Sequence, residues 1–97
     1  MTQPFVTSWT GGGPCTTPYE TGQTAAQWFD NHETRTRAQL ELAPPGDGGP
    51  ITTTWKSGGA QKSVVTHKLE GETTNEWIDR HFKRVREELE GNPPDLT

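Results

Sequence analysis

The chain repeats itself, and this repeat constrains its fold more than any other feature. Residues 5–21 align with residues 51–67 at an offset of 46, and residues 22–45 align with residues 71–94 at an offset of 49. Fifteen of the 41 aligned positions are identical, whereas a composition of this kind would supply roughly two or three identities by chance. The sequence therefore predicts a tandem duplication.

Neither copy is long enough to bury a core of its own, so we expect the two to share one. We predict a single domain over residues 1–97, with a first unit at 5–45, a second unit at 51–94 and a glycine-rich linker at 46–50.

The second unit predicts two strands and a helix. Residues 51–57 are rich in threonine and contain a tryptophan, which favours a strand. Gly58 and Gly59 predict a turn, and residues 61–69 then predict the returning strand.

Alternation along these strands predicts one apolar face and one wet face. Ile51, Thr53 and Trp55 share the first face with Ser63, Val65, His67 and Leu69. The wet face is then rich in threonine and lysine, with Thr52, Thr54, Lys56, Lys62, Val64, Thr66 and Lys68.

The helices are predicted by capping boxes, at Thr73–Glu76 in the second unit and Thr24–Gln27 in the first. Apolar residues then recur at helical spacing, and Pro44-Pro45 and residues 91–94 end the two helices. The expected buried faces are Trp28, Phe29, His32, Thr36 and Leu40 in the first helix and Trp77, Ile78, His81, Phe82, Val85 and Leu89 in the second.

The first unit predicts the same elements less clearly. Phe5 to Thr10 is the expected strand, Gly11 to Gly13 the turn and Cys15 to Glu20 the return. Pro14 and Pro18 interrupt that return, so we expect it to be short or at a sheet edge.

Together the elements predict an α+β fold of order ββαββα. Two such units can pair into a four-stranded antiparallel sheet with both helices on one face and pseudo-two-fold symmetry. This is the single-chain equivalent of a two-fold dimer. We expect a monomer, and the sequence leaves further dimerisation open.

Apolar residues are scarce, at 27% of the chain against roughly 45–50% in typical domains by a count that includes glycine. Four tryptophans compensate, because each can bury roughly 150–250 Å². We therefore expect a thin aromatic core built on Trp9, Trp28, Trp55 and Trp77.

Several classes of protein are disfavoured. The first ten residues lack the basic and apolar segments of a signal peptide, and no apolar run approaches the ~18 residues of a membrane span. The single cysteine, Cys15, allows no intrachain disulfide and fits a cytoplasmic protein. The net charge of −4 argues against general binding of phosphate backbones.

Three groups of residues are candidate binding sites. Lys56, Lys62 and Lys68 could contact a nucleic acid. The repeated pairs Arg35/Arg84 and Arg37/Arg86 could bind phosphate or a carboxylate, or simply lie on exposed helix faces. His32 and His81 could bind a metal near the symmetry axis, or pack in the core below a tryptophan.

No catalytic grouping and no cofactor motif is recognisable. The leading hypothesis is therefore a non-enzymatic module that docks a protein partner through the face or an edge of its sheet. Nucleic-acid binding through the basic second hairpin is one alternative. Metal or small-ligand binding by His32 and His81 is another.

Overall fold

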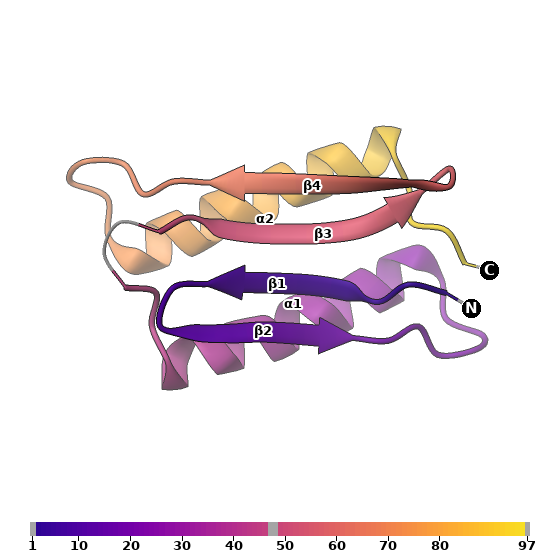
Figure 1. Cartoon of the computed structure of the whole chain (residues 1–97), viewed down its shortest axis with the longest axis horizontal. Coiled ribbons are helices and arrows are strands. Elements are labelled where there is room, and N and C mark those ends of the chain that lie inside the picture. The colour runs from indigo at the N-terminus through magenta and orange to yellow at the C-terminus, as the bar shows by residue number, and fades with distance from the viewer. Residues whose placement is uncertain (1, 47–48, 97) are drawn as a thin grey trace.

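The computed structural model describes residues 2–46 and 49–96 (Figure 1). The predicted α+β class is confirmed, as is the four-stranded antiparallel sheet with two helices. Residues 47–48 of the predicted linker lie outside the described residues. In chain order the elements are β1 (Phe5–Trp9), β2 (Gly12–Thr17), α1 (Ala25–Leu42), β3 (Ile51–Ser57), β4 (Ala60–Thr66) and α2 (Thr74–Gly91).

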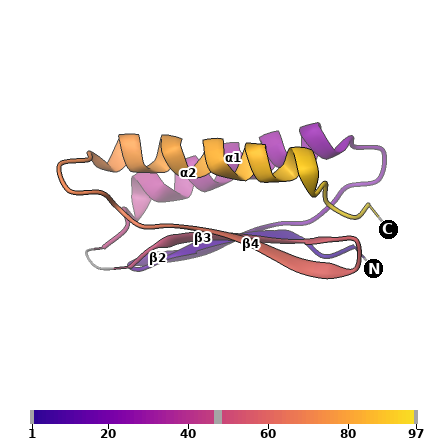
Figure 2. The ribbon, with the colours of Figure 1, turned by 90° about the horizontal axis from the view of Figure 1, so that it is seen from above.

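The two halves of the chain meet in the middle of the sheet. The strand order is β2-β1-β3-β4, and every neighbouring pair is antiparallel. Both helices cover the same face of this sheet, and no helix or strand of the described residues covers the other face (Figure 2). At the central β1–β3 pair, Thr7 lies opposite Thr53.

Strand β2 lies at one edge of the sheet, as its prolines predict. It spans Gly12–Thr17, so it begins and ends three residues earlier than expected. The register with β1 shifts between Thr7 and Trp9, where Gly13 has a φ of 72° and Pro14 has no N–H to offer a neighbour.

The alternation predicted for residues 51–57 matches the structure, but the faces assigned to residues 61–69 are wrong. Thr66 lies opposite Ile51 and Val64 lies opposite Thr53, so both point toward the helices and are buried. Val65 instead lies on the uncovered face and is 40% exposed. Val64 and Val65 are adjacent and equally apolar, so strand pairing decides which one is buried.

The pairing of the strands also shows where the offset between the two halves changes from 46 to 49 residues, which is earlier in the chain than the sequence alignment places it. Thr17 lies opposite Phe5 in the first hairpin, and Thr66 lies opposite Ile51 in the second. Thr17 and Thr66 therefore correspond at the offset of 49 that relates the helices, and the extra residues of the second half fall within its hairpin.

Both helices begin with the predicted capping boxes. Thr24 and Thr73 accept hydrogen bonds from the backbone N–H groups of Gln27 and Glu76, whose side chains bond back to the caps. The buried residues are the expected ones, except that Leu89 is only partly buried. Gly91 is the last helical residue of α2, and the chain leaves through Asn92 with a φ of −136°.

All four tryptophans are buried, with exposed fractions of 6% or less. Their indole N–H groups tie strands to helices through backbone carbonyl oxygens. Trp28 donates to Thr17 and Trp77 donates to Thr66, both at 2.9 Å. Trp9 donates to Ala43 at 2.8 Å and Trp55 donates to Asn92 at 2.9 Å, just past the helix ends. The sparse core is thus aromatic, and its polar edges are satisfied.

We predict that Trp28→Ala and Trp77→Ala each lower the free energy of unfolding by about 3–5 kcal/mol, because each removes a buried indole. Urea unfolding followed by circular dichroism measures this loss. Leu42→Ala is the matched control, since Leu42 on α1 is 84% exposed and its loss should change little. Tryptophan variants as stable as the Leu42 variant would contradict the role of these residues in the core.

Candidate functional site

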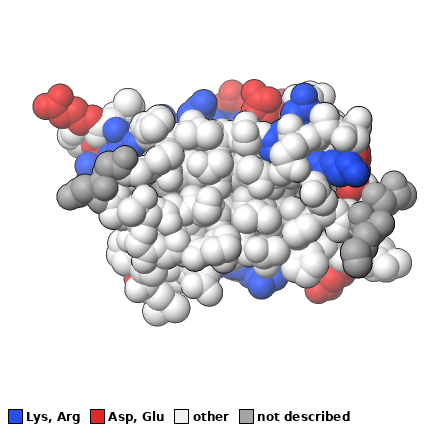
Figure 3. Space-filling model, in the orientation of Figure 1, with Lys and Arg blue, Asp and Glu red and all other residues white. Residues whose placement is uncertain are grey.

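The uncovered face of the sheet is broad and almost uncharged (Figure 3). Side chains from all four strands reach it, most of them hydroxyl-bearing or apolar, and Lys56 is its one charged residue among the strand residues described. The face comprises Val6, Ser8, Thr16, Thr52, Thr54, Lys56, Gln61, Ser63 and Val65. We call this surface the open face.

The three candidate lysines do not gather on the open face. Lys62 lies opposite Trp55 and therefore on the side of the sheet that faces the helices. Lys68 follows β4, outside any strand. Only Lys56 reaches the open face, so the predicted threonine and lysine surface does not form as a unit.

Both edges of the sheet carry features that discourage the addition of another strand. At the β2 edge, Pro14 lacks a backbone donor. At the β4 edge, Arg84 donates to the Val65 carbonyl oxygen at 2.8 Å. Arg80 donates to the carbonyl of His67 just beyond. Docking at the face therefore fits the structure better than docking at an edge.

Arg37 and Arg86 link the two helices. Arg37 pairs with Asp79 of the other helix at 2.8 Å and lies 5.2 Å from the centre of the Phe82 ring. Arg86 pairs with Asp30 at 3.0 Å and lies 4.8 Å from the centre of the Phe29 ring. Glu33 contacts both guanidinium groups. These arginines are already engaged within the molecule.

The other repeated arginine pair is less alike. Arg84 donates to the Thr66 hydroxyl at 3.1 Å as well as to the edge of β4. Arg35, its counterpart on α1, is exposed and makes no such bond within the described part of the chain.

His32 and His81 lie in a buried chain of hydrogen bonds that crosses between the two halves. Nε2 of His32 is 2.7 Å from Thr7 Oγ1, and Nε2 of His81 is 2.7 Å from Thr53 Oγ1. The two threonine hydroxyls are 2.6 Å apart. At the outer ends, Nδ1 of His32 and Nδ1 of His81 each lie 2.8 Å from a hydroxyl, those of Thr17 and Thr66. We call these six residues the Thr–His chain.

Burial keeps both rings neutral. It lowers the pKa of His32 from 6.5 to about 4, with a further contribution from Arg35. It lowers the pKa of His81 to about 3, where Arg84, His32 and Arg80 add to the effect. Cys15 is the other buried residue with a titratable side chain among those described.

The Thr–His chain uses both nitrogens of each ring, so neither ring offers a free lone pair to a metal. Among residues 2–46 and 49–96, no group of three or more potential metal-binding side chains occurs. The threonine partners were missed in the sequence. The signal that could have found them is the identity of Thr7 and Thr53 between the two aligned segments.

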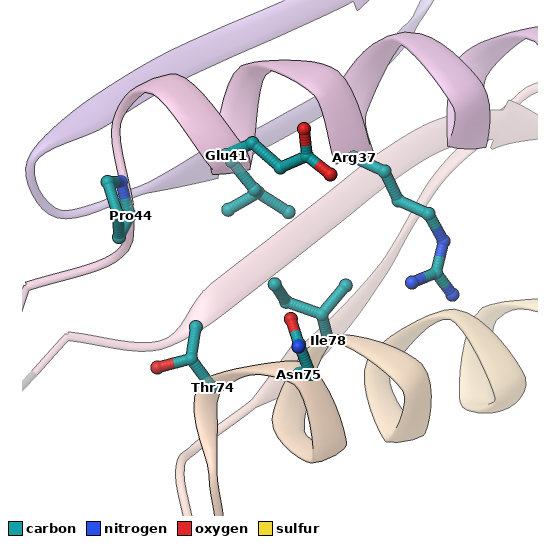
Figure 4. Close-up of a pocket in the computed structure, with 7 residues that line it drawn as sticks. Arg37, Glu41, Pro44, Thr74, Asn75 and Ile78 are labelled. Atoms are coloured by element: carbon teal, nitrogen blue, oxygen red, sulfur yellow. The ribbon is translucent and has the colours of Figure 1, made fainter.

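Two hollows lie at opposite ends of the groove between the helices. One of about 320 Å³ is lined by Arg37, Leu40, Glu41, Pro44, Thr74, Asn75 and Ile78 (Figure 4). The other, of about 290 Å³, is lined by Ala25, Ala26, Phe29, Arg86, Leu89, Glu90, Pro93 and Pro94. The seven positions of the first hollow recur in the second at the 49-residue offset, where Ala25, Ala26 and Phe29 stand in place of Thr74, Asn75 and Ile78.

In comparisons with family models, curated proteins and solved structures, the chain matches none of them. Neither helix in the described ranges has the length and apolar character needed to cross a membrane.

We predict that the free energy of unfolding falls as the pH drops from about 6.5 to 4.5, by up to about 1.4 kcal/mol per pH unit for each buried histidine. In the unfolded chain the histidine rings have a pKa near 6.5, whereas in the folded protein the pKa is about 4 for His32 and about 3 for His81. Between these values the unfolded state therefore binds more protons than the folded state. Stability is therefore greatest above pH 6.5. Urea unfolding at a series of pH values measures the slope.

Two features make this measurement specific. The variant His67→Gln removes the exposed histidine and should keep the slope. Hydrogen bonding by Arg80 lowers the pKa of Glu72 from 4.5 to about 2, so the stability that this ion pair contributes declines only below about pH 4.5. A flat stability between pH 6.5 and 4.5 would show that the rings are not buried as neutral groups.

Proposed function

We propose that this chain is a small non-enzymatic interaction module that docks a protein partner on its open face. The observation that carries the proposal is the character of that face. It is uncovered, spans all four strands, and presents hydroxyls and two valines with a single charge among the described strand residues. On the helices, by contrast, Arg37 and Arg86 are already paired with Asp79 and Asp30.

The open face suits a flat, weakly charged partner surface. Serine and threonine hydroxyls both donate and accept hydrogen bonds, so they can pair with exposed backbone or side-chain groups of either kind. Val6 and Val65 add apolar contact on β1 and β4. With so little charge, the face offers little electrostatic steering, so shape and hydrogen bonding would govern recognition.

Nucleic-acid binding receives less support from the geometry. Such surfaces collect several cations or aromatic rings on one face. Here the lysines are dispersed and all four tryptophans are buried. Metal binding by His32 and His81 receives less support too, because the threonines occupy both ring nitrogens.

The proposal includes the origin and state of the chain. We infer that the two halves are copies of one ββα unit, which supports a monomer with the architecture of a two-fold dimer. Equivalent tryptophan and histidine hydrogen bonds in the two halves support this inference. A cytoplasmic location agrees with the single cysteine.

We expect a photo-reactive amino acid at Ser8 or Ser63 on the open face to crosslink the same protein in a lysate of the source organism. Placed at Gln39 or Lys83, exposed on the helices, it should not capture that protein. Mass spectrometry of the crosslinked products identifies the partner. Thr52→Lys, which adds a charge within the open face, should abolish the crosslink from both serines.

Gln39→Lys is the matched control, because it adds the same charge on a helix and should leave the crosslink intact. Capture of a partner only from the helix positions would overturn the proposal. Recovery of nucleic acid, or of a second copy of this chain, would reassign the open face to that occupant.

A further inference from the structure

The central bonds of the Thr–His chain need more hydrogens than its two central hydroxyls can supply. Three hydrogen bonds run from His32 Nε2 through Thr7 and Thr53 to His81 Nε2. Each needs one hydrogen, and each hydroxyl carries one. The third hydrogen must therefore sit on Nε2 of one histidine.

The other histidine cannot also carry its hydrogen on Nε2. Four hydrogens would then compete for three bonds, and one donor would be left buried without an acceptor, which is costly. A neutral ring has one N–H and one acceptor nitrogen. The two rings must therefore be opposite tautomers, even though they occupy equivalent positions in the two halves.

Arg84 selects one direction for the hydrogen bonds. Its guanidinium donates to the Thr66 hydroxyl oxygen. A hydroxyl that accepts one hydrogen bond donates its own hydrogen more strongly, because successive donor-to-acceptor bonds polarise one another. Thr66 is therefore favoured as the donor to Nδ1 of His81. The hydrogen of His81 then lies on Nε2, and the donors continue through Thr53 and Thr7 to His32. Arg35 offers no matching bond to Thr17 among the described residues.

Thr36 independently favours the same direction. Its buried hydroxyl lies 3.4 Å from Nε2 of His32, which is the partner that the structure shows for it. If Nε2 of His32 is unprotonated, the Thr36 hydrogen can share its lone pair with the closer Thr7 hydroxyl, whereas a protonated Nε2 offers that hydrogen no acceptor. Val85 stands at the equivalent position of α2, and a valine side chain has no hydroxyl to place beside His81.

We propose that the Thr–His chain is a directional hydrogen-bond chain that runs from Arg84 to Thr17 and locks His81 as its Nε2–H tautomer and His32 as its Nδ1–H tautomer. Reversal of the direction requires both rings to change tautomer together. The chain is thus a two-state element at the junction of the halves, with the difference between the halves selecting one state.

Long-range ¹⁵N–¹H correlation spectra of the uniformly labelled full chain at pH 7 test this assignment. We expect His81 to show a protonated Nε2 and an unprotonated Nδ1, and His32 to show the reverse. His67 is exposed and serves as the internal reference. The same tautomer in both buried rings, or the opposite assignment, would overturn the proposal.

Variants test what selects the direction. Arg84→Met keeps the aliphatic stem but removes the donor, and Thr36→Val removes the second bias. We expect the double variant to populate both directions, so that the two tautomers of each ring are present together. Arg35→Met is the control and should leave the wild-type pattern unchanged. An unchanged pattern in the double variant would show that these two residues do not select the direction.

Discussion

The hydrogen bond between Thr7 and Thr53 is the point on which the two halves of this protein depend. It lies at the β1–β3 pairing that joins them, where the register pairs just three residues from each side. On either side it continues into a histidine that is anchored on a helix. A buried polar network of this kind favours one arrangement when every member is satisfied and is costly when one is missing. The register of β1 against β3 therefore depends on the positions of both helices on the sheet, because the same hydrogen bonds connect all four elements.

The aromatic core surrounds this polar junction rather than replacing it. Phe5 stacks on the His32 ring with centroids 5.4 Å apart and also packs edge-on against Trp28 at 4.5 Å. The helices meet mainly through Phe29 and Phe82, 6.2 Å apart, and through the arginines that cover these rings. A chain with 27% hydrophobic residues thus folds because a few large rings bury area while their polar edges bond to backbone or hydroxyl groups.

Local patterns predicted the helices well, since capping boxes and helical periodicity are written within single segments. Thr24, Thr73 and nearly all of both buried helix faces followed from spacing alone. Which side of β4 faces the helices could not be predicted in this way. Val64 and Val65 are equally apolar, and only the pairing with β3 decides which of them is buried. The bonds of His32 to Thr7 and Thr17 and the ion pair from Arg37 to Asp79 join residues 15 to 42 positions apart. Such contacts exist only once the sheet and helices are assembled.

The differences between the two halves are as informative as their likeness. A symmetric pair of units could not satisfy the hydrogens of a Thr–His chain, because the bond on the axis carries only one. Some asymmetry is therefore required in the protons even where the side chains match. Arg84 and Thr36 stand where the other half has Arg35 and Val85, so the side chains now favour one direction. In a dimer of two identical subunits, either direction of the hydrogen bonds would be equally stable, so neither would persist. Two units linked in one chain can differ in sequence, and the difference can favour one direction permanently.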